Sequence, residues 1–354
     1  MTFRLLSPTD DGWLDLFTRL PIERQDVFHS PGFAVLCQET IHADNQVMLA
    51  AWDGGGHDVI LYPFAKRDLA KLCKLDTLSG LYDITGLYGR GGLAVGSVGP
   101  EGLAAFHRHF AHWCAESGVI CTFDRYHPVW ANESAAAAET KVMDVGGFVV
   151  VDMTDDIETI ESRYKYSVRK DLRKAERGAV STDIQTGDEV DLDRFLEVYY
   201  GTMDRNNAGA FYYFERPFFE GVSKYMSGQY LYIHSRIDGQ IVSTELVLRH
   251  GLYAHSFLGG TDRWAQPHCP NHRLKRDLIR HLKQIGCRWF LLGGGSSEND
   301  GIFNYKRAFA PDGVLPSRIG ATIVDAAAYA GAKDAFAASG RDINSRRFQF
   351  YDPN

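Results

Sequence analysis

The chain has 354 residues, of which 45% are apolar and 23% charged, a composition that indicates a folded globular protein and excludes a disordered or fibrous one. Its length suits two domains of ordinary size. The net charge of −7 argues against a general nucleic-acid binder such as a DNA-binding protein, since phosphate contacts need an excess of Lys and Arg. A local basic patch stays possible, so charge has to be examined segment by segment.

The sequence also bears on the compartment. No apolar run approaches the roughly 20 residues that span a bilayer, and the N-terminal segment carries acidic residues where a signal peptide needs an apolar stretch. The six cysteines show no CxxC spacing, which favours buried thiols in a reducing compartment. We therefore expect a cytoplasmic protein with no membrane insertion.

The same order of elements occurs twice along the chain. The first half predicts a strand hairpin interrupted by Gly54 to Gly56, followed by a helix and a strand, over 47–68, 103–118 and 119–126. The second half predicts a hairpin turned by Asp238-Gly239, then a strand, a helix and a strand, over 229–250, 252–260, 271–286 and 287–295.

An Ala-rich segment without an apolar period, near residues 131–147, separates the two repeats. The sequence therefore predicts an α/β (α+β) protein of two similar lobes, residues 1–145 and 146–354, each with a mixed, mostly antiparallel sheet flanked by helices. The tail from about residue 321 is expected to add an edge strand and a helix to the second lobe.

A strongly basic helix follows the first strand of the second lobe. Lys165 to Arg177 contains six basic residues against Asp171 and Glu176, while Tyr164, Val168, Leu172 and Ala175 recur at helical spacing and predict a buried stripe. Arg169 and Arg173 lie one turn apart, and Arg side chains hold phosphate or carboxylate groups bidentately. The alternative is a solvated charged face.

A glycine-rich motif spans residues 293–313, where three glycines come directly after a predicted buried strand. Phe303, Lys306 and Phe309 follow Asp300 at helical spacing. An isolated Lys placed in this way provides positive charge where a carbonyl oxygen becomes negative during acyl transfer. A Lys that merely extends from an aromatic patch is the alternative.

A second glycine-rich segment, residues 82–93, carries Asp83, Tyr88 and Arg90, which we expect the turns to expose for binding; a plain linker is equally compatible with this composition. Other chemistry is disfavoured. The cluster of His268, Cys269 and His272 lacks zinc-site spacing, so no metal is expected. There is no GxSxG nucleophile, phosphate-binding GxxxxGK[ST] loop or dinucleotide-binding GxGxxG, so no bound cofactor is expected.

Taken together, these motifs resemble the FemAB family of aminoacyl- and acyltransferases, and the resemblance covers most of the chain. YDITGLYGRGGL is similar to the family's D-x-x-x-x-Y-G-x-G-G loop and FDRYHPVWAN to its R-F-H-P-x-x-x-N strand end. SVRKDLRKAERGA is similar to its basic helix, and GTDRWAQPHCPNHRL and GGGSSENDGIFNYKRAF to its late G-T-D and G-G-G motifs.

The resemblance implies a tandem pair of GNAT-like lobes that transfers an activated acyl group, typically aminoacyl from aminoacyl-tRNA, to an amine acceptor such as a peptidoglycan precursor or a small metabolite. Acyl-CoA is the alternative donor, but Pro270 and the lack of a glycine pair disfavour its pyrophosphate turn, although a helix starting at Asn271 could attract an anion. A non-catalytic ligand-binding protein of the same fold is a further alternative.

The expected mechanism is direct transfer. The Asp83 to Arg90 loop is expected to hold the acceptor, with Arg169, Arg173, Phe303 and Asn271 as further substrate contacts. Lys306 is expected to stabilise the oxyanion, and Asp300 is the candidate general base.

Overall fold

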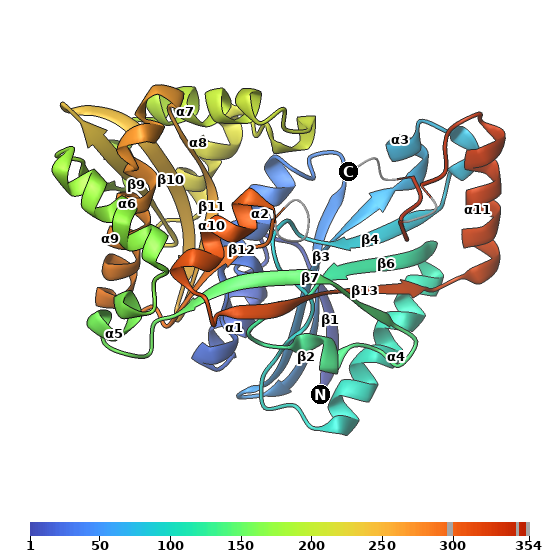
Figure 1. The fold of residues 1–354 in the computed structure, drawn as a ribbon. Coiled ribbons are helices and arrows are strands. Elements are labelled where there is room, and N and C mark those ends of the chain that lie inside the picture. Colours follow the sequence, from blue (N-terminus) through green and yellow to red (C-terminus); the bar gives the residue numbers. More distant parts are fainter. Residues whose placement is uncertain (296–299, 345–346, 352–354) are drawn as a thin grey trace. The chain divides into compact units, whose positions relative to one another are not determined.

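The computed structural model describes residues 1–295, 300–344 and 347–351, and divides into two compact units. The first contains residues 1–145 and 317–354, and the second residues 146–316. Each unit is an α/β layer structure in which helices cover a mixed, mostly antiparallel sheet, as the sequence predicts (Figure 1).

In the first unit, the strand order is β1-β2-β3-β4-β6-β13, with β5 beside β3. Neighbours are antiparallel except β4 and β6, which are parallel. The strands are β1 (Thr2–Leu6), β2 (Gln46–Gly55), β3 (Asp58–Asp68), β4 (Tyr82–Gly86), β5 (Ala94–Val95), β6 (Val119–Arg125) and β13 (Val314–Ile323). The helices are α1 (Asp11–Arg19), α2 (Pro31–Glu39), α3 (Leu69–Cys73), α4 (Pro100–Glu116) and α11 (Ala326–Ala338).

In the second unit, the order is β7-β12-β11-β10-β9-β8, and only β11 and β12 are parallel. The strands are β7 (Lys141–Asp152), β8 (Ser181–Gln185), β9 (Tyr230–Ile237), β10 (Gln240–His250), β11 (Tyr253–Thr261) and β12 (Trp289–Gly293). Residues 141–145 of β7 belong to the first unit, and residues 314–316 of β13 belong to the second. The helices are α5 (Ile157–Ser162), α6 (Tyr166–Arg177), α7 (Leu192–Arg205), α8 (Arg216–Tyr225), α9 (Pro270–Gln284) and α10 (Gly301–Phe309).

Helices of the second unit cover both faces of its sheet, as the alternating side chains of β9 show. Leu231 and Ile233 of β9 belong to the same core as Leu274 and Leu278 of α9. Tyr232, which lies between them, packs against Phe195 of α7 with ring centroids 4.9 Å apart. Since successive side chains of a strand point to opposite faces, α9 and α7 cover opposite sides.

The predicted hairpins and helices are confirmed, with local differences. Asp238 and Gly239 both have positive φ, of 50° and 79°, as a type I′ turn requires. A short additional helix, α5, precedes the predicted basic helix α6, and the two are separated by a turn at residues 163–165. Asp156 caps α5 by accepting from the Thr159 amide, and Tyr164, in the break, is buried.

The assignment of the C-terminal tail to the second lobe is wrong. Residues Ile319 to Ile323 pair antiparallel with β6, and α11 packs its Ala332 and Phe336 into a core of the first unit. The aromatic residues Phe350 and Tyr351 join the same core. The tail thus completes the first unit, while the division between the units falls between Val145 and Gly146.

Asp83 of β4 connects the tail to the first sheet. The Arg67 side chain donates to its Oδ1 at 2.9 Å and its Oδ2 at 2.7 Å, and Gln349 and Tyr351 donate to Oδ2 at 2.7 and 2.5 Å. The prediction that Asp83 is exposed is therefore wrong: the side chain is fully buried, with both oxygens occupied.

We predict that Asp83→Asn lowers the free energy of unfolding by about 3 kcal/mol, because it leaves the buried Arg67 guanidinium without its counter-charge. Urea unfolding followed by circular dichroism measures the change. Asp144→Asn, which weakens the exposed pair with Arg318, is the control and should cost about 0–1 kcal/mol. Equal stabilities of the two variants would contradict the structural role of Asp83.

Candidate active site

The central feature of the second unit is the point where β11 and β12 separate. They pair only from Tyr253 to His255 and from Trp289 to Leu291, although β11 continues to Thr261. Beyond His255, β11 keeps its antiparallel partner β10 but has no register with β12. Diverging strands leave backbone groups on their inner edges available to a ligand.

A buried ion pair lies beside this divergence. The Lys275 ammonium of α9 is 2.7 and 2.6 Å from the two carboxylate oxygens of Glu245 on β10, and it also donates to the Ser256 hydroxyl at 3.1 Å. Both charged residues are buried. The pair therefore fixes α9 to the sheet where the strands part, since moving either charge would leave the other buried without a partner.

Lys306 lies on α10, close to the three glycines that follow β12. Its Nζ donates to the Gly294 carbonyl at 2.7 Å. Gly293 has a φ of 92°, and an added Cβ there would lie 3.0 Å from this Nζ, so a side chain would be strained and would crowd the ammonium. Residues 296–299 of the predicted motif lie outside the described residues.

Asp300 begins the helix that carries Lys306. Its Oδ1 accepts from the Phe303 amide at 2.6 Å, an N-cap interaction. Gly295 lies directly against this carboxylate, because a Cβ there would be 2.4 Å from Oδ1. The structure thus gives Asp300 a capping role beside the Gly294–Lys306 contact.

Tyr305 connects α10 to the start of α9. Its hydroxyl donates to the backbone carbonyl of Asn271 at 3.2 Å, and burial, together with the nearby Glu245 charge, raises the pKa of Tyr305 well above its usual value. Its ring also contacts His272 edge-on at 5.1 Å. The Glu245 pair, the beginning of α9 and the Lys306 helix therefore form one connected cluster.

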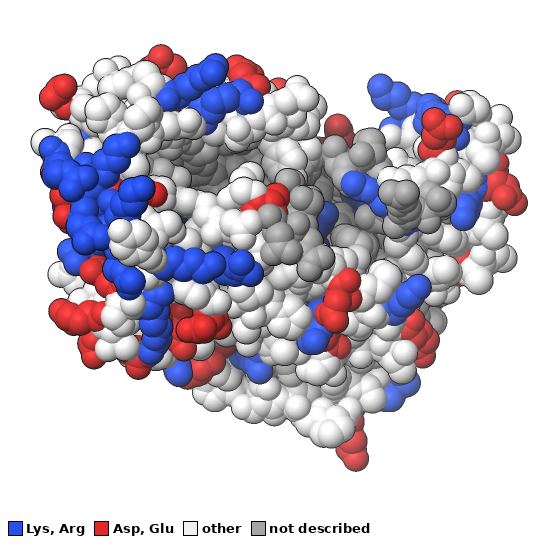
Figure 2. Space-filling view, viewed as in Figure 1, with Lys and Arg blue, Asp and Glu red and all other residues white. Residues whose placement is uncertain are grey.

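The basic helix α6 divides its charges between two sides. Val168, Leu172 and Ala175 are buried, as predicted. The two acidic residues pair with α9: Asp171 lies 3.4 Å from His272 Nε2, and Glu176 lies 2.7 Å from Arg276 Nη1. The exposed face is left with the bases Arg169, Lys170, Arg173, Lys174 and Arg177. Figure 2 shows a cluster of Lys and Arg side chains where Figure 1 shows α6.

The remaining predicted substrate-binding residues differ in burial and in the unit to which they belong. Phe303 is buried in the core of the second unit, not displayed to a ligand. In the first unit, Tyr88 and Arg90 are half-buried. Arg90 Nη1 donates to the Ser317 hydroxyl at 3.3 Å, and burial, with Arg125 nearby, lowers the pKa of Arg90 to about 10.

The beginning of α9 bears on the choice of donor. Cys269 caps it in the left-handed conformation with a φ of 58°, and Pro270, which has no N–H, occupies its first turn. Pro270 therefore provides no backbone N–H donor in the first turn of α9. Asn271 contributes its carbonyl to Tyr305.

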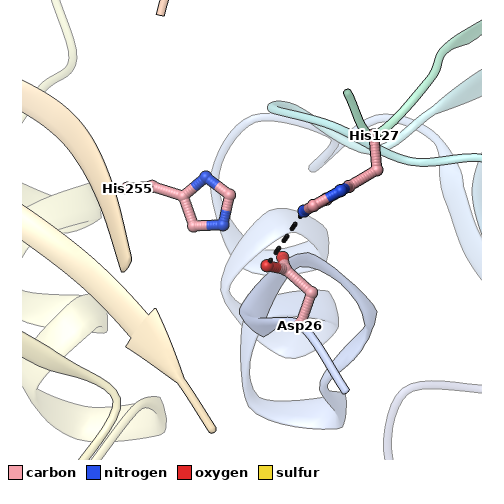
Figure 3. A group of neighbouring side chains, drawn as sticks. All are labelled: Asp26, His127 and His255. Atoms are coloured by element: carbon pink, nitrogen blue, oxygen red, sulfur yellow. Dashed lines mark ion pairs between the residues drawn. The ribbon is translucent and has the colours of Figure 1, made fainter. Parts of the chain in front are cut away.

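A motif of the first unit also has a structural role. The Asn132 amide donates to the carbonyls of Gly91 and Leu93, holding the glycine-rich loop, and its Oδ1 accepts from the His127 amide. His127 Nδ1 accepts from the Trp130 amide, so a neutral imidazole carries its proton on Nε2, 3.6 Å from Asp26 Oδ2 (Figure 3).

One group in the second unit could hold a metal ion. Asp171, Cys269 and His272 place one ligand atom each within 4.8 Å of the others. His268 of the cluster considered in the sequence is not part of this group. These three partly exposed ligands come from α6, from α9 and from the residue that precedes α9, and they are fewer than a structural zinc site uses.

Comparisons with known proteins agree with this architecture. A family model described as an acetyltransferase (GNAT) domain matches residues 162–307. The crystal structure of FemX is similar, with a TM-score of 0.68 and 11% identity over 90% of this chain and 97% of that one. The chain therefore shares the fold of FemX, and its second unit matches a GNAT domain.

Two further solved structures share the fold. One is the C-terminal domain of a putative lysylphosphatidylglycerol synthetase from Agrobacterium fabrum, with a TM-score of 0.56 and 16% identity over 92% of this chain and 95% of that one. The other is a tandem GNAT protein from the clavulanic acid biosynthesis pathway, with a TM-score of 0.50 and 11% identity over 91% and 98%. Identities this low establish the fold alone.

A search of curated proteins with this sequence found no match. Among the described residues, no helix combines the length and apolar character needed to cross a membrane.

Sequence reasoning missed the Glu245–Lys275 pair. Its signal was present: Glu245 is the one charged residue in the buried run Ile241–Leu248 of β10. A carboxylate in such a strand needs a cation, and Lys275 follows Leu274 on the buried side of α9.

We predict that Glu245→Gln lowers the free energy of unfolding by about 3–5 kcal/mol, because it leaves the Lys275 ammonium buried and unpaired. The double variant Glu245→Leu/Lys275→Met should recover much of this loss, since it removes both charges. Asp193→Asn, at the exposed pair with Arg216, serves as the control. Chemical denaturation measures all three, and equal losses in the Gln and Asn variants would disprove the prediction.

Proposed function

We propose that the protein is an acyltransferase that forms an amide by moving an aminoacyl group from aminoacyl-tRNA to an amine acceptor, either a peptidoglycan precursor or a small metabolite. The GNAT domain match supports acyl transfer in general. The observation that supports a tRNA donor is the outward basic face of α6. Its acidic residues are paired with α9, so its exposed charges present phosphate-binding groups in an acidic protein.

In this proposal, the acceptor amine attacks the ester carbonyl of the donor. The new C–N bond forms first and gives a tetrahedral intermediate with an oxyanion. When this intermediate collapses, the ester C–O bond breaks, its electron pair leaves with the ribose oxygen, and the amine proton passes to that oxygen directly or through Asp300. Lys306, whose Nζ donates to the Gly294 carbonyl, brings its positive charge to the oxyanion and stabilises it. Asn271 orients Tyr305 through its carbonyl.

The remaining residues have less direct roles. Tyr88 and Arg90 bind the acceptor. Asp83 has a structural role instead, because its carboxylate is held by Arg67 and Gln349. Phe303 positions α10 through the core instead of touching substrate.

An acyl-CoA donor is the second candidate, supported by the same GNAT domain match. Against it, α9 begins with Pro270, which removes one of the backbone donors that such a site uses for pyrophosphate. A non-catalytic binding protein would retain the fold without consuming either donor. The protein is incubated with charged tRNA or with acyl-CoA, and deproteinised cell extract supplies the acceptor. Loss of the aminoacyl ester indicates a tRNA donor, loss of the thioester indicates an acyl-CoA donor, and loss of neither indicates a non-catalytic binding protein.

We predict that Lys306→Met lowers the turnover of the consumed donor by roughly 10²-fold or more, the effect of losing one oxyanion donor. Single-turnover loss of the radiolabelled acyl group measures it. Lys306→Arg should retain part of the activity, and Lys224→Met, an exposed lysine on α8, should retain all of it. Unchanged turnover in Lys306→Met would remove Lys306 from the mechanism.

We also predict that the double variant Arg169→Ala/Arg173→Ala weakens binding of unfractionated charged tRNA and reduces the slope of log affinity against log salt by about 1–2, as expected for two lost phosphate contacts. Fluorescence titration between 50 and 200 mM salt is a suitable measurement. Lys141→Ala/Lys333→Ala removes the same charge from exposed positions of the first unit. An equal loss in both double variants would indicate a non-specific charge effect and overturn the assignment.

A further inference from the structure

A cavity of about 390 Å³ lies within the first unit. It is bounded by α4, by β6 and the end of β13, and by the segment 136–140. Its size is in the range of small-molecule sites. None of its lining residues belongs to α6, α9 or α10, so it is separate from the residues that the transfer proposal uses in the second unit.

The walls of the cavity are largely aromatic. Tyr62, Phe106 and Phe110 line it, with the Tyr62 and Phe110 rings edge-to-face at 5.3 Å and the Phe106 and Phe110 rings parallel at 6.0 Å. Tyr126 lines it as well. Such rings pack against an apolar ligand, and their faces also attract a cation.

The Asp124 carboxyl group lies beside these aromatic rings. Asp124 Oδ2 accepts from the Tyr62 hydroxyl at 2.9 Å, whereas Oδ1 is buried and has no hydrogen-bond partner. Burial raises the pKa of Asp124 to about 7, against the opposing effects of the Tyr62 hydrogen bond and Arg125. In the described part of the chain, no Lys, Arg or His forms an ion pair with Asp124.

The fold holds this carboxyl group in place. Asp124 pairs with Gly320 of β13, and a Cβ on Gly86 of β4 would lie 3.1 Å from Oδ1, so glycine provides the space. On the other side, His107 Nε2 lies 3.0 Å from the Ala135 carbonyl, and the Thr140 and Thr322 hydroxyls lie 2.9 Å apart, fixing the covering segment. The cavity is therefore maintained by specific contacts.

The chemistry of a fitting ligand follows from these walls. A carboxyl group without a cation in an apolar site is unfavourable when ionised. An asparagine could satisfy Tyr62 without this cost. A protonated amine beside the carboxyl group would supply the missing charge, while its apolar part fills the aromatic space. Arg108 and Glu139, which also line the cavity, carry opposite charges, so together they add no net charge to its lining.

We propose that this cavity binds a small primary amine with an aromatic or branched apolar body, whose ammonium group pairs with Asp124 between Tyr62 and Phe110. This site goes beyond the transfer reaction, since it requires only residues of the first unit and does not depend on which acyl donor is used.

The test compares two probes of the same shape, tryptamine and tryptophol, which differ in an ammonium and a hydroxyl group. Isothermal titration calorimetry of the full chain at pH 8, where Asp124 is largely ionised, should show tryptamine binding at least about tenfold more tightly, the strength of a charge-assisted pair. Equal affinities, or no binding of either probe, would overturn the proposal.

Two variants assign the binding to this cavity. Asp124→Asn should reduce tryptamine affinity about tenfold and leave tryptophol unchanged, because the shape is kept and the charge removed. Asp144→Asn, an exposed carboxylate of the same unit, is the matched control and should bind both probes normally.

Ala111→Phe, at an exposed helix position that lines the cavity, should block both probes without disturbing the core. Circular dichroism verifies folding. Tryptamine binding that survives both Asp124→Asn and Ala111→Phe would place the amine elsewhere and refute the site. Because the readout is binding and not transfer, its failure leaves the acyltransferase proposal unaffected.

Discussion

The ion pair between Glu245 and Lys275 is the interaction on which the candidate active site depends. It joins α9 to β10 beside the three-residue pairing of β11 and β12, where both charges are buried. The position of α9 determines where the Asn271 carbonyl lies, and this carbonyl accepts a hydrogen bond from the Tyr305 hydroxyl of α10. Lys306 is the next residue of α10. A buried pair of this kind adds little net stability compared with an apolar replacement, but it allows one arrangement of the helix only.

Helix α6 packs against the core of the second unit on one side and presents positive charge on the other. Its apolar stripe and its two acidic residues face the protein, where α9 supplies complementary groups. The bases consequently remain outside without acidic neighbours from their own helix. This local separation produces a positive field on a molecule with a net charge of −7, which composition alone would not reveal.

Much of the fold was predictable because its signals are local. Strand alternation, the Asp238-Gly239 turn and the apolar stripe of α6 each act over a few residues, and the elements formed as predicted. The tail was misplaced because its pairing with β6 is a long-range contact that an Ala-rich segment does not encode. Asp83 was expected to be exposed because glycines follow it, but its partners Arg67 and Tyr351 are distant in sequence. Glu245 and Lys275 are also distant in sequence, so each could be recognised as an unusual residue but their ion pair could not be predicted.

The return of the C-terminal tail makes the first unit discontinuous, with the second unit inserted into it. During vectorial synthesis, β6 emerges from the ribosome about 190 residues before its partner strand β13. At ordinary elongation rates this leaves a sheet edge unpaired for roughly 10–40 s. An uncovered edge can pair with other chains, so the nascent first unit needs protection that the contiguous second unit does not.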